Sequence, residues 1–341
     1  LDSSVSDLAS PVTVEGEGFK AVFSPATGSL TSLVYGGREM IADSQGPQLD
    51  AFRAPVNNDT WINRAWWKTG LDNLQHKVLS SSVALNDQGL PVLSFRIRSQ
   101  APCAERLRSR RTDGSWGEAE LNRGTHEIKQ LTDQPFGDND FMFLTDLDWT
   151  VYPDGSILLD ADITGNDSTL ILPRLGFTMS VPREYEQFAF YGRGPLENYP
   201  DRLTGSFPGV YTQRVADQYV NYAKPQSTGN REEVRWASLT DADGYGVLAV
   251  GARPMSVSAL PWTERQLLLA PHAYQLPAPG ATQLHLDLGV TGLGGASCGQ
   301  GGPLPPHRIL GGHHTHTLLL RPLTPAATPA AQSKVVPVAR N

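Results

Sequence analysis

Short runs of alternating apolar and polar residues are the most regular pattern in this 341-residue chain. Residues 93–97 (Leu-Ser-Phe-Arg-Ile) alternate at every position, and residues 19–23 and 157–163 do so with one exception each. Successive side chains of a strand point to opposite faces, so each run predicts a strand that buries one side. The pattern therefore predicts a protein built from half-buried strands.

Turn residues separate these runs at short intervals. Residues 24–28 (Ser-Pro-Ala-Thr-Gly) divide the run at 19–23 from the apolar run at 30–35, which Gly36 and Gly37 close. This arrangement predicts a β-hairpin. The totals of 33 glycines and 26 prolines also suit many strands joined by turns.

One stretch, residues 62–74, favours a helix. It contains Trp66 and Trp67, which we expect to pack in the core, and Asn58 and Asp59 ahead of it are good helix N-caps. Because strands far outnumber this helix, we predict an all-β, antiparallel sandwich with few short helices.

The composition narrows the class of protein. Hydrophobic residues make up 39% and charged residues 18%, which is a globular composition, and the net charge of −7 argues against a nucleic-acid partner. No run of 18 apolar residues predicts a membrane span, and the two cysteines, Cys103 and Cys298, form no disulfide framework or metal motif. We expect a cytoplasmic protein without a membrane partner.

The densest group of chemically interesting residues follows the aromatic run that ends at Tyr191. Gly192, Gly194, Pro195 and Pro200 break the strand pattern within nine residues and predict a shaped loop. This loop carries Arg193, Glu197, Asn198, Tyr199, Asp201 and Arg202. One interpretation is a structural turn held by local Arg–carboxylate pairs, and the other is a functional loop.

Residues 194–202 (Gly-Pro-Leu-Glu-Asn-Tyr-Pro-Asp-Arg) resemble the G-P-x-E-N-Y-P-D-R signature of the last domain, the small-chain domain, of glycoside hydrolase family 2 β-galactosidases. Residues 53–59 are similar to that family's R-A-P-x-D-N-D element through Arg53, Asn58 and Asp59, with Asn57 in place of an Asp. Residues 225–236 resemble its P-Q-x-x-G-N-R-x-x-V-R-W element, which includes Asn230 and Arg231. The resemblance covers residues 14–322.

The resemblance implies a fold and a domain division. The fold is a large antiparallel β-supersandwich of the galactose mutarotase type. Residues 1–13 would be a linker from upstream domains, residues 14–322 the small-chain domain, and residues 323–341 a loose C-terminal tail.

The resemblance also implies a function. The chain would be the C-terminal domain of an enzyme that hydrolyses terminal β-D-galactosides, shaping the carbohydrate pocket while packing on an upstream (β/α)₈ barrel of the same polypeptide. That barrel would hold both catalytic glutamates, so we expect no catalytic residue, no cofactor and no activity in this chain alone. Any Mg or Na would belong to the barrel, and the full enzyme could form a homo-oligomer.

By the same resemblance, the 194–202 loop borders the mouth of the active site. The rim would consist of Arg193, Gly194, Glu197, Asn198, Tyr199, Asp201, Arg202, Ser297 and Cys298. Residues 292–299 are similar to the family's G-x-G-G-x-x-S-W-G loop, but Ser297-Cys298-Gly299 replaces Ser-Trp-Gly. Cys298 would then line the pocket as a small apolar group, or it is an ordinary buried thiol.

Three alternatives remain open from the residues. His313, His314 and His316 resemble a metal cluster, but their segment has no carboxylate or thiol, so a polar strand edge is favoured and no metal is predicted. An aldose mutarotase would need a His and a Glu as an acid/base pair. A carbohydrate-binding module would need exposed aromatics such as Trp61 and Trp66–Trp67. The identity of the glycoside is left open.

Overall fold

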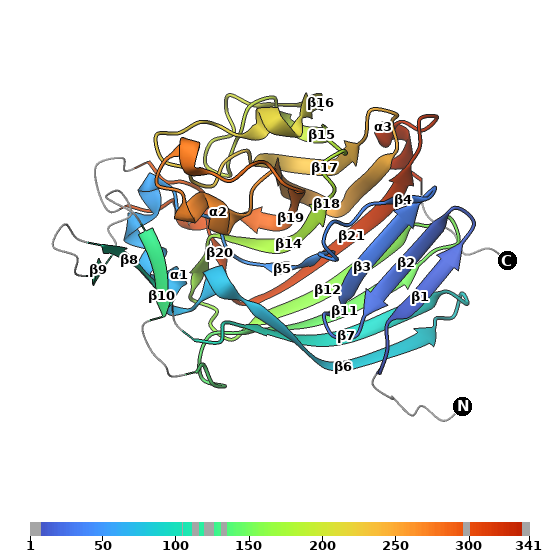
Figure 1. Cartoon of the computed structure of the whole chain (residues 1–341), viewed down its shortest axis with the longest axis horizontal. Coiled ribbons are helices and arrows are strands. Elements are labelled where there is room, and N and C mark those ends of the chain that lie inside the picture. Colours follow the sequence, from blue (N-terminus) through green and yellow to red (C-terminus); the bar gives the residue numbers. More distant parts are fainter. Residues whose placement is uncertain are drawn as a thin grey trace.

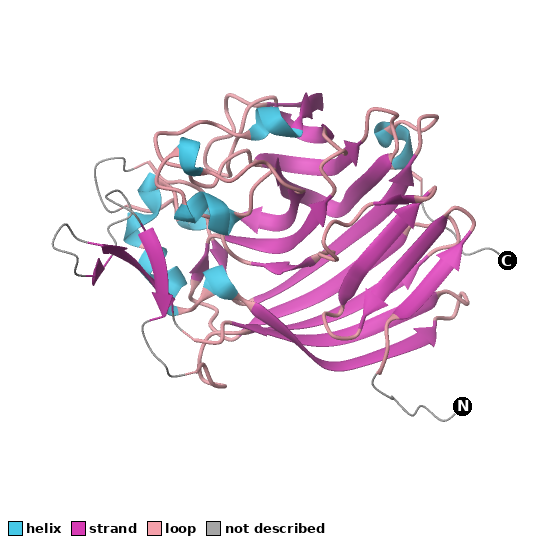
Figure 2. Cartoon of the chain, in the orientation of Figure 1, coloured by secondary structure: helices cyan, strands magenta, loops and turns pink. Residues whose placement is uncertain are grey.

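A large curled antiparallel sheet runs through the molecule (Figure 1). The computed structural model describes residues 8–103, 105–110, 116–118, 126–130, 135–295 and 301–335. Within them the main path of the sheet follows the order β16 (Phe207–Arg214), β15 (Gln187–Gly194), β17 (Arg231–Thr240), β18 (Gly246–Leu260), β21 (His313–Leu323), β12 (Ile157–Gly165), β11 (Phe143–Val151), β7 (Pro91–Gln100) and β6 (Gln75–Leu85). The predicted all-β antiparallel class is confirmed, and strands dominate the chain in Figure 2.

The alternating runs form the buried face of this sheet as predicted. Leu93 of β7 pairs with Trp149 of β11, which pairs with Leu159 of β12, and that residue pairs with Leu318 of β21. All four side chains are at most 1% exposed. Directly paired residues of antiparallel strands project to the same face, so this row forms one continuous apolar band.

A small four-stranded sheet packs against the large one. Its strands are β1 (Val12–Gly16), β2 (Phe19–Ser24), β3 (Ser29–Tyr35) and β4 (Arg38–Glu39). The predicted hairpin is β2 and β3, which pair antiparallel. Phe23 meets Trp149 of the large sheet edge to face at 5.7 Å, and Trp149 Nε1 donates to Gly28 O at 3.1 Å. Buried aromatic pairs of this kind join the two layers.

The large sheet forks at β18. The first half of this strand, from Gly246 to Gly251, pairs with β21, and its second half, from Ser256 to Leu260, pairs with β19 (Thr282–Val290). Beyond β19 follow β14 (Arg174–Val181) and β5 (Gln48–Asp50). Besides its pairing with β17, this strand therefore belongs to two further ladders, which diverge on either side of residues 252–255.

The described helices are short. They are α1 (Asn63–Lys68), α2 (Glu264–Leu269) and α3 (Pro329–Gln332), with 3₁₀ turns at Asn57–Trp61, Leu71–Asn73, Val215–Gln218, Ala273–Gln275 and Pro305–His307. Thr263 caps α2 in a capping box, since its hydroxyl accepts from Gln266 N at 3.1 Å and Gln266 Oε1 accepts from Thr263 N at 2.9 Å.

The helix predicted for residues 62–74 is wrong in extent. Only Asn63–Lys68 is α-helical, because Gly70 adopts a left-handed conformation with φ of 67° and ends it. Asn58 and Asp59 lie in a preceding 3₁₀ turn, and the residue before α1 is Ile62, which makes no side-chain cap. Trp66 and Trp67 are buried as predicted, at 0% and 8% exposure.

Smaller elements complete the fold. Three strands, β8 (Glu105–Arg110), β9 (Trp116–Glu118) and β10 (His126–Gln130), form a separate sheet, and β13 (Ile171–Leu172) pairs with β20 (Ile309–Leu310). The C-terminal segment contains α3, and Arg321 Nη1 donates to Gln332 O at 3.2 Å. No helix among the described residues is long and apolar enough to cross a bilayer.

Candidate functional site

Glu197 is the most heavily bonded acid of the loop after β15. Its Oε2 accepts hydrogen bonds from the Thr228 hydroxyl at 2.8 Å and the Gly229 amide at 2.9 Å. Two tyrosines add to these, because the Tyr199 hydroxyl donates to Oε2 at 3.4 Å and the Tyr222 hydroxyl donates to Oε1. The carboxylate therefore ties its own loop to the segment before β17.

The two arginines beside this glutamate bind elsewhere, which corrects the expectation of local Arg–carboxylate pairs. Arg193 places Nε 2.8 Å from Glu233 Oε2 and donates from Nη1 to Ser206 O at 2.9 Å. Arg202 donates to the carbonyl of Gly294. The glutamate is held by hydroxyl and amide donors instead.

Asn198 and Asn230 join the same two segments through their backbones and side chains. Asn198 N donates to Asn230 O at 2.9 Å, and Asn230 Nδ2 donates to Asn198 O at 2.8 Å. Asn198 Oδ1 also accepts from Glu232 N at 2.9 Å. Both asparagines are at most 2% exposed, so these bonds replace water in the interior.

Asp201 holds the glycine-rich loop after β19. Its carboxylate accepts from Leu293 N at 3.1 Å and from Gly294 N at 2.7 Å. A Cβ at Gly292 would lie only 2.6 Å from the Asp201 carboxyl carbon, so a side chain there would clash with the acid. The first glycine of the loop is thus required by the close approach of the carboxylate.

Arg53 reaches the same loop from the opposite side. Its guanidinium binds Asp59 with two hydrogen bonds, at 2.6 Å and 3.1 Å, and donates to the carbonyls of Thr291 and Gly292. Both members of the pair are at most 2% exposed. Asn58 adds a bond from Nδ2 to Leu293 O at 3.2 Å. A fork-shaped guanidinium suits this simultaneous binding of a carboxylate and carbonyls.

The sequence elements at residues 53–59 and 194–202 therefore both contact residues 291–294. The 225–236 element contacts the 194–202 loop through the bonds of Thr228 and Gly229 to Glu197. A surface cavity of about 300 Å³ lies at this junction. It is lined by Val56, Asn57, Asn58, Glu197, Tyr199, Arg202, Tyr222, Gln226, Ser227 and Leu293. Polar, hydroxyl and aromatic groups converging on one concave site are typical of a small-molecule pocket.

The predicted rim residues divide into two groups. Glu197, Tyr199 and Arg202 line this cavity, as does the motif residue Asn58. Four others, Arg193, Gly194, Asn198 and Asp201, are not among its lining residues and shape the loop from behind. Ser297 and Cys298 lie outside the described residues. Contact of any of these with a sugar stays a prediction.

Arg231 is buried beneath the cavity wall. Its guanidinium donates to Gly229 O at 3.0 Å and to Gln218 Oε1 at 2.8 Å, and it lies 5.6 Å from the Phe190 ring. Burial lowers its pKa to about 10, while Glu197 acts in the opposite sense. Through these contacts it supports the turn that presents Gly229.

Tyr222 is a lining residue that the sequence analysis missed. It is 38% exposed, and its hydroxyl bonds Glu197. Burial, followed by the bond to Glu197, raises its pKa above the usual value, so the hydroxyl remains protonated and donates. Its position three residues before the 225–236 element could have indicated that it lies near the same site.

A second polar cluster, centred on Arg174, was also missed. Arg174 is 1% exposed, with Nη1 3.0 Å from Glu264 Oε1 and Nε 3.1 Å from Asp287 Oδ2. Glu264 Oε2 also accepts from Ala54 N at 2.7 Å, and its Oε1 accepts from the Ser227 hydroxyl at 3.1 Å. The sequence pattern did not reveal this cluster, because its members lie far apart in the chain and Asp287 alternates with leucines as a solvent-facing residue would.

Asp287 is the least satisfied acid of the Arg174 cluster. It is fully buried, and among the described residues neither carboxylate oxygen has a partner in hydrogen-bond geometry, although Arg174 Nε lies 3.1 Å from Oδ2. Gly176 on the paired strand makes room for it, since a Cβ there would lie 2.6 Å from Asp287 Oδ1. Burial raises the pKa of Asp287 to about 8, against the opposing effect of Arg174.

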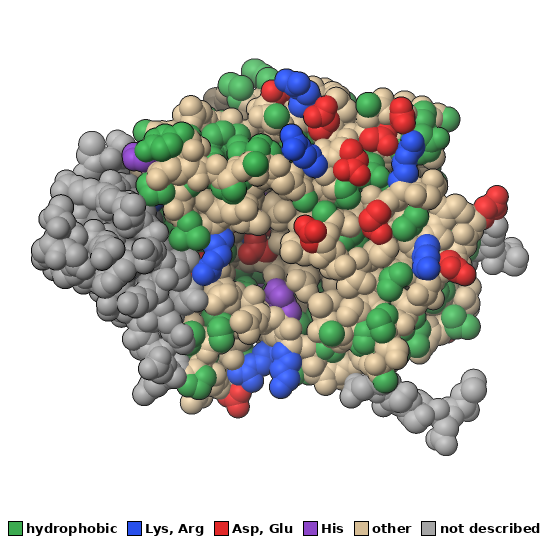
Figure 3. All heavy atoms as spheres, in the orientation of Figure 1, with side chains coloured by type: hydrophobic (Ala, Val, Ile, Leu, Met, Phe, Trp, Pro, Cys, Tyr) green, Lys and Arg blue, Asp and Glu red, His purple; other side chains and the backbone are tan. Residues whose placement is uncertain are grey.

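Asp50 and His285 extend this cluster toward the surface. His285 Nδ1 lies 3.5 Å from Asp50 Oδ2, and burial raises the pKa of Asp50 to about 6. Both line a cavity of about 290 Å³, together with Gln45, Gln48, Phe52, His76, Thr178, Glu264, Arg265 and Gln283 among others. Figure 3 shows a hollow containing a histidine on the face toward the viewer.

The three histidines near the C-terminus lie on β21, as the favoured strand-edge interpretation predicted. His313 Nε2 lies 3.0 Å from both Asp162 oxygens, whereas His314 and His316 bind backbone carbonyls. Across the described residues, no group of three or more His, Cys, Asp or Glu side chains is arranged to hold a metal ion.

Comparison with known families decides what this convergence of motifs represents. The family model described as "Beta galactosidase small chain" matches residues 15–320. The chain belongs to the β-galactosidase small-chain family. The resemblance of this small-chain domain to the family, first stated from the motifs, is thereby confirmed.

Relatives of the small-chain domain are much longer proteins. A β-galactosidase of Priestia megaterium is 26% identical over 325 residues, which cover 92% of this chain and 26% of the relative. A β-galactosidase of Arthrobacter sp. (strain B7) is 29% identical, with 81% and 26% covered. The chain thus spans about a quarter of the length of these relatives.

Solved structures similar to the small-chain domain include galactose mutarotase-like proteins. A galactose mutarotase related enzyme from Lactobacillus acidophilus matches with a TM-score of 0.43 and 10% identity, covering 92% of this chain and 97% of that one. A putative aldose 1-epimerase from Escherichia coli K12 matches with a TM-score of 0.44 and 11% identity, covering 92% and 98%.

Proposed function

We propose that this chain is the pocket-shaping C-terminal domain of a β-galactosidase that hydrolyses terminal β-D-galactosides. In this proposal the catalytic glutamates belong to a barrel domain of the same polypeptide. The observation that carries it is the convergence of the family elements on the 300 Å³ cavity, in a chain whose relatives are named β-galactosidases.

The chemistry of the cavity supports a binding role over a catalytic one. A retaining glycosidase needs two carboxyl groups about 5–5.5 Å apart, one of which exchanges a proton during the reaction. Glu197 is the one carboxylate among the lining residues, and it already accepts four hydrogen bonds. An acid engaged in this way holds the cavity wall in place, and Asn58, Arg202 and Tyr222, which line the cavity from three segments, are then available to a sugar.

Exposed apolar residues near this cavity support packing against another domain. Leu196 in the loop is 73% exposed, and Phe207 and Val210 on β16 are 70% and 59% exposed. β16 ends the main path of the large sheet and pairs with β15 alone. Large exposed apolar side chains beside an open sheet edge are typical of a surface that another element covers.

Hydrolysis by the chain alone tests this proposal. The 341-residue chain is incubated with o-nitrophenyl β-D-galactoside, and no release of nitrophenol above the uncatalysed rate is expected. The control is a β-galactosidase with its barrel, assayed under the same conditions. A robust rate from this chain, lost on substitution of its own acids, would refute the assignment of catalysis to a barrel.

Sugar mutarotation is a second candidate, and the Asp50–His285 pair in the 290 Å³ cavity is the observation that favours it. An acid and an imidazole could exchange protons with the ring oxygen and the anomeric hydroxyl. Polarimetry on fresh α-D-galactose tests this activity. An acceleration by the chain that Asp50→Asn abolishes would establish mutarotation, and an unchanged rate would exclude it.

A further inference from the structure

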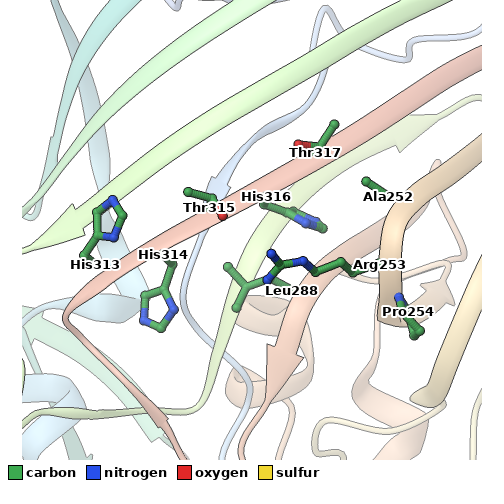
Figure 4. A pocket seen from close by; sticks show the side chains of 9 residues that line it. All are labelled: Ala252, Arg253, Pro254, Leu288, His313, His314, Thr315, His316 and Thr317. Atoms are coloured by element: carbon green, nitrogen blue, oxygen red, sulfur yellow. The ribbon is translucent and has the colours of Figure 1, made fainter.

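The largest of the cavities described here lies at the fork of the large sheet, away from the family elements. It has a volume of about 530 Å³ and is lined by Ala252, Arg253, Pro254, Leu288, His313, His314, Thr315, His316 and Thr317 (Figure 4). Residues 252–254 form the bend where β18 leaves β21 and joins β19. The space between β19 and β21 remains open on one side of this bend.

The fork leaves strand edges without partners. β21 pairs with β18 only from Leu318 onward, so residues 313–317 have a neighbouring strand, β12, on one side alone. β19 likewise pairs with β18 only as far as Asp287, and Leu288 lies beyond that ladder. Backbone groups along such an edge are available to a ligand.

His316 presents a defined hydrogen-bond acceptor to this cavity. It is 7% exposed, and its Nε2 lies 3.1 Å from Leu286 O, which accepts only, so Nε2 carries the proton. Burial lowers the pKa of His316 to about 4, which keeps the ring neutral. Its Nδ1 therefore has a free lone pair, and no described residue donates to it. Figure 4 shows the ring on the side of β21 that faces Arg253.

His314 adds a second imidazole on the same face of the strand. Its Nε2 lies 2.6 Å from Leu310 O and donates to it, which leaves Nδ1 without a partner among the described residues. Positions 314 and 316 are two apart on β21, so both rings project from one face.

Arg253 supplies the positive charge. Within the part of the chain that the structure describes, its guanidinium makes no ion pair or hydrogen bond, and Figure 4 shows it reaching from the bend toward Leu288 and His316. The nearby acids are engaged by other groups, because Asp162 lies 3.0 Å from His313 Nε2 and Asp160 accepts from Thr317 at 2.7 Å.

We propose that the fork cavity binds a small anion that carries hydroxyl groups, of the sugar-acid or sugar-phosphate class. The guanidinium matches a carboxylate or phosphate, which it binds in a forked, charge-assisted geometry. The Nδ1 lone pair of the neutral His316 ring can only accept, so it requires a donor on the ligand, and a hydroxyl supplies one. Leu288 and Ala252 give an apolar surface for the carbon skeleton. This site lies outside the proposed galactosidase function and uses none of its residues.

Four small molecules test whether binding requires both the anionic group and the hydroxyl groups of the ligand. Sodium D-gluconate and D-glucose 6-phosphate have both an anionic group and hydroxyls, D-glucose has hydroxyls alone, and inorganic phosphate has charge alone. Isothermal titration on the 341-residue chain should show binding of at least one of the first two, at least about tenfold tighter than either control. Comparing the affinities for gluconate and glucose 6-phosphate shows whether the site prefers a sugar acid or a sugar phosphate.

Two arginine variants place the binding at the fork. Arg253→Gln should weaken binding of the tighter anion about tenfold or more, since it removes the charge from an exposed bend. Arg214→Gln is the matched control, because it removes the same charge from an exposed residue of β16, and it should leave affinity unchanged.

Histidine NMR gives a readout that does not depend on folding of a variant. Binding should shift the His316 Nδ1 resonance of ¹⁵N-histidine-labelled protein as its lone pair accepts a hydroxyl proton. The proposal is overturned if neither anion binds more tightly than D-glucose and phosphate, if Arg253→Gln and Arg214→Gln behave alike, or if His316 is silent at saturation. None of these results bears on galactoside hydrolysis.

Discussion

The motif loop and the Arg174 cluster hold similar charged groups in opposite ways. In the loop of residues 194–202, called the motif loop below, Glu197 and Asp201 accept bonds from hydroxyls and backbone amides. Outside that loop, Asp59 accepts two hydrogen bonds from Arg53. Around Arg174, two carboxylates lie within 3.1 Å of one guanidinium, and a third, Asp50, acts on it electrostatically.

This difference separates two uses of buried charge. Carboxylates that meet fixed donors determine the shape of a loop. Carboxylates that outnumber their cation cannot all stay ionised in a medium of low polarity, so some of them retain a proton. The motif loop is thus built for geometry, whereas the Arg174 cluster is sensitive to protons.

The largest effect is expected from removing the central cation of the Arg174 cluster. Arg174→Met leaves Glu264 and Asp287 buried without a counter-charge, and breaking such a pair costs about 3–5 kcal/mol. Urea denaturation should show this loss in the free energy of unfolding. Arg214→Met is the control, since its pair with Asp217 is exposed and contributes about 0–1 kcal/mol. Equal losses in both variants would contradict the contrast drawn here.

A smaller loss is expected in the motif loop. Glu197→Gln places an amide NH₂ group where donors now converge, so one or more of the Tyr222, Thr228 and Gly229 bonds is lost, at a cost of about 1–3 kcal/mol. Thermal unfolding measures it. Glu233→Gln serves as the control, because that side chain is 41% exposed and pairs only with Arg193. A Glu197→Gln variant as stable as its control would show that the carboxylate is not the anchor.

The pH dependence of stability should distinguish the two regions. The pKa of Asp287 is raised in the folded state to about 8, so its contribution is fully present below its unfolded pKa of about 4 and is lost as pH rises through about 8. The free energy of unfolding should therefore decrease from pH 5 to pH 7 and further to pH 9. Asp287→Asn should make this decrease smaller by about 1 kcal/mol per pH unit or more below pH 8. An unchanged pH dependence in Asp287→Asn would show that a group other than Asp287 titrates in this range.

The smallest effect is expected at the cavity mouth. Tyr222→Phe removes one hydroxyl bond to Glu197 from a side chain that is 38% exposed, which costs about 0.5–1.5 kcal/mol. Chemical denaturation can resolve this difference. A cost as large as that of Glu197→Gln would mean that the tyrosine alone supports the loop.

Much of the sheet could be predicted from the sequence because period-two alternation reports one buried face directly. Leu93, Phe95 and Ile97 illustrate this, since each lies buried on β7 as expected. The helix over residues 62–74 failed in extent because Gly70 takes a left-handed conformation that composition does not reveal. Local pattern predicts elements well and their ends poorly.

The candidate site was only partly predictable. The motifs located Glu197, Arg202 and Asn58, but the residues that these three bind lie far away in sequence. The interpretation that Arg193 and Arg202 pair with carboxylates of their own loop was wrong. The Arg174 cluster could not be predicted because its members lie far apart in sequence, and only pairing of β14 with β19 brings Arg174 and Asp287 together. Contacts that depend on tertiary register leave no trace in local composition.

Glu264 at the start of α2 links the Arg174 cluster to segments at the surface pocket. One of its oxygens meets Arg174 and the Ser227 hydroxyl, and the other holds the amide of Ala54, next to the segment that contains Val56 and Asn57. A shift of this carboxylate would pull on two walls of the surface pocket at once. Glu264 therefore connects the Arg174 cluster to two segments at the surface pocket, one at Ala54 and the other at Ser227.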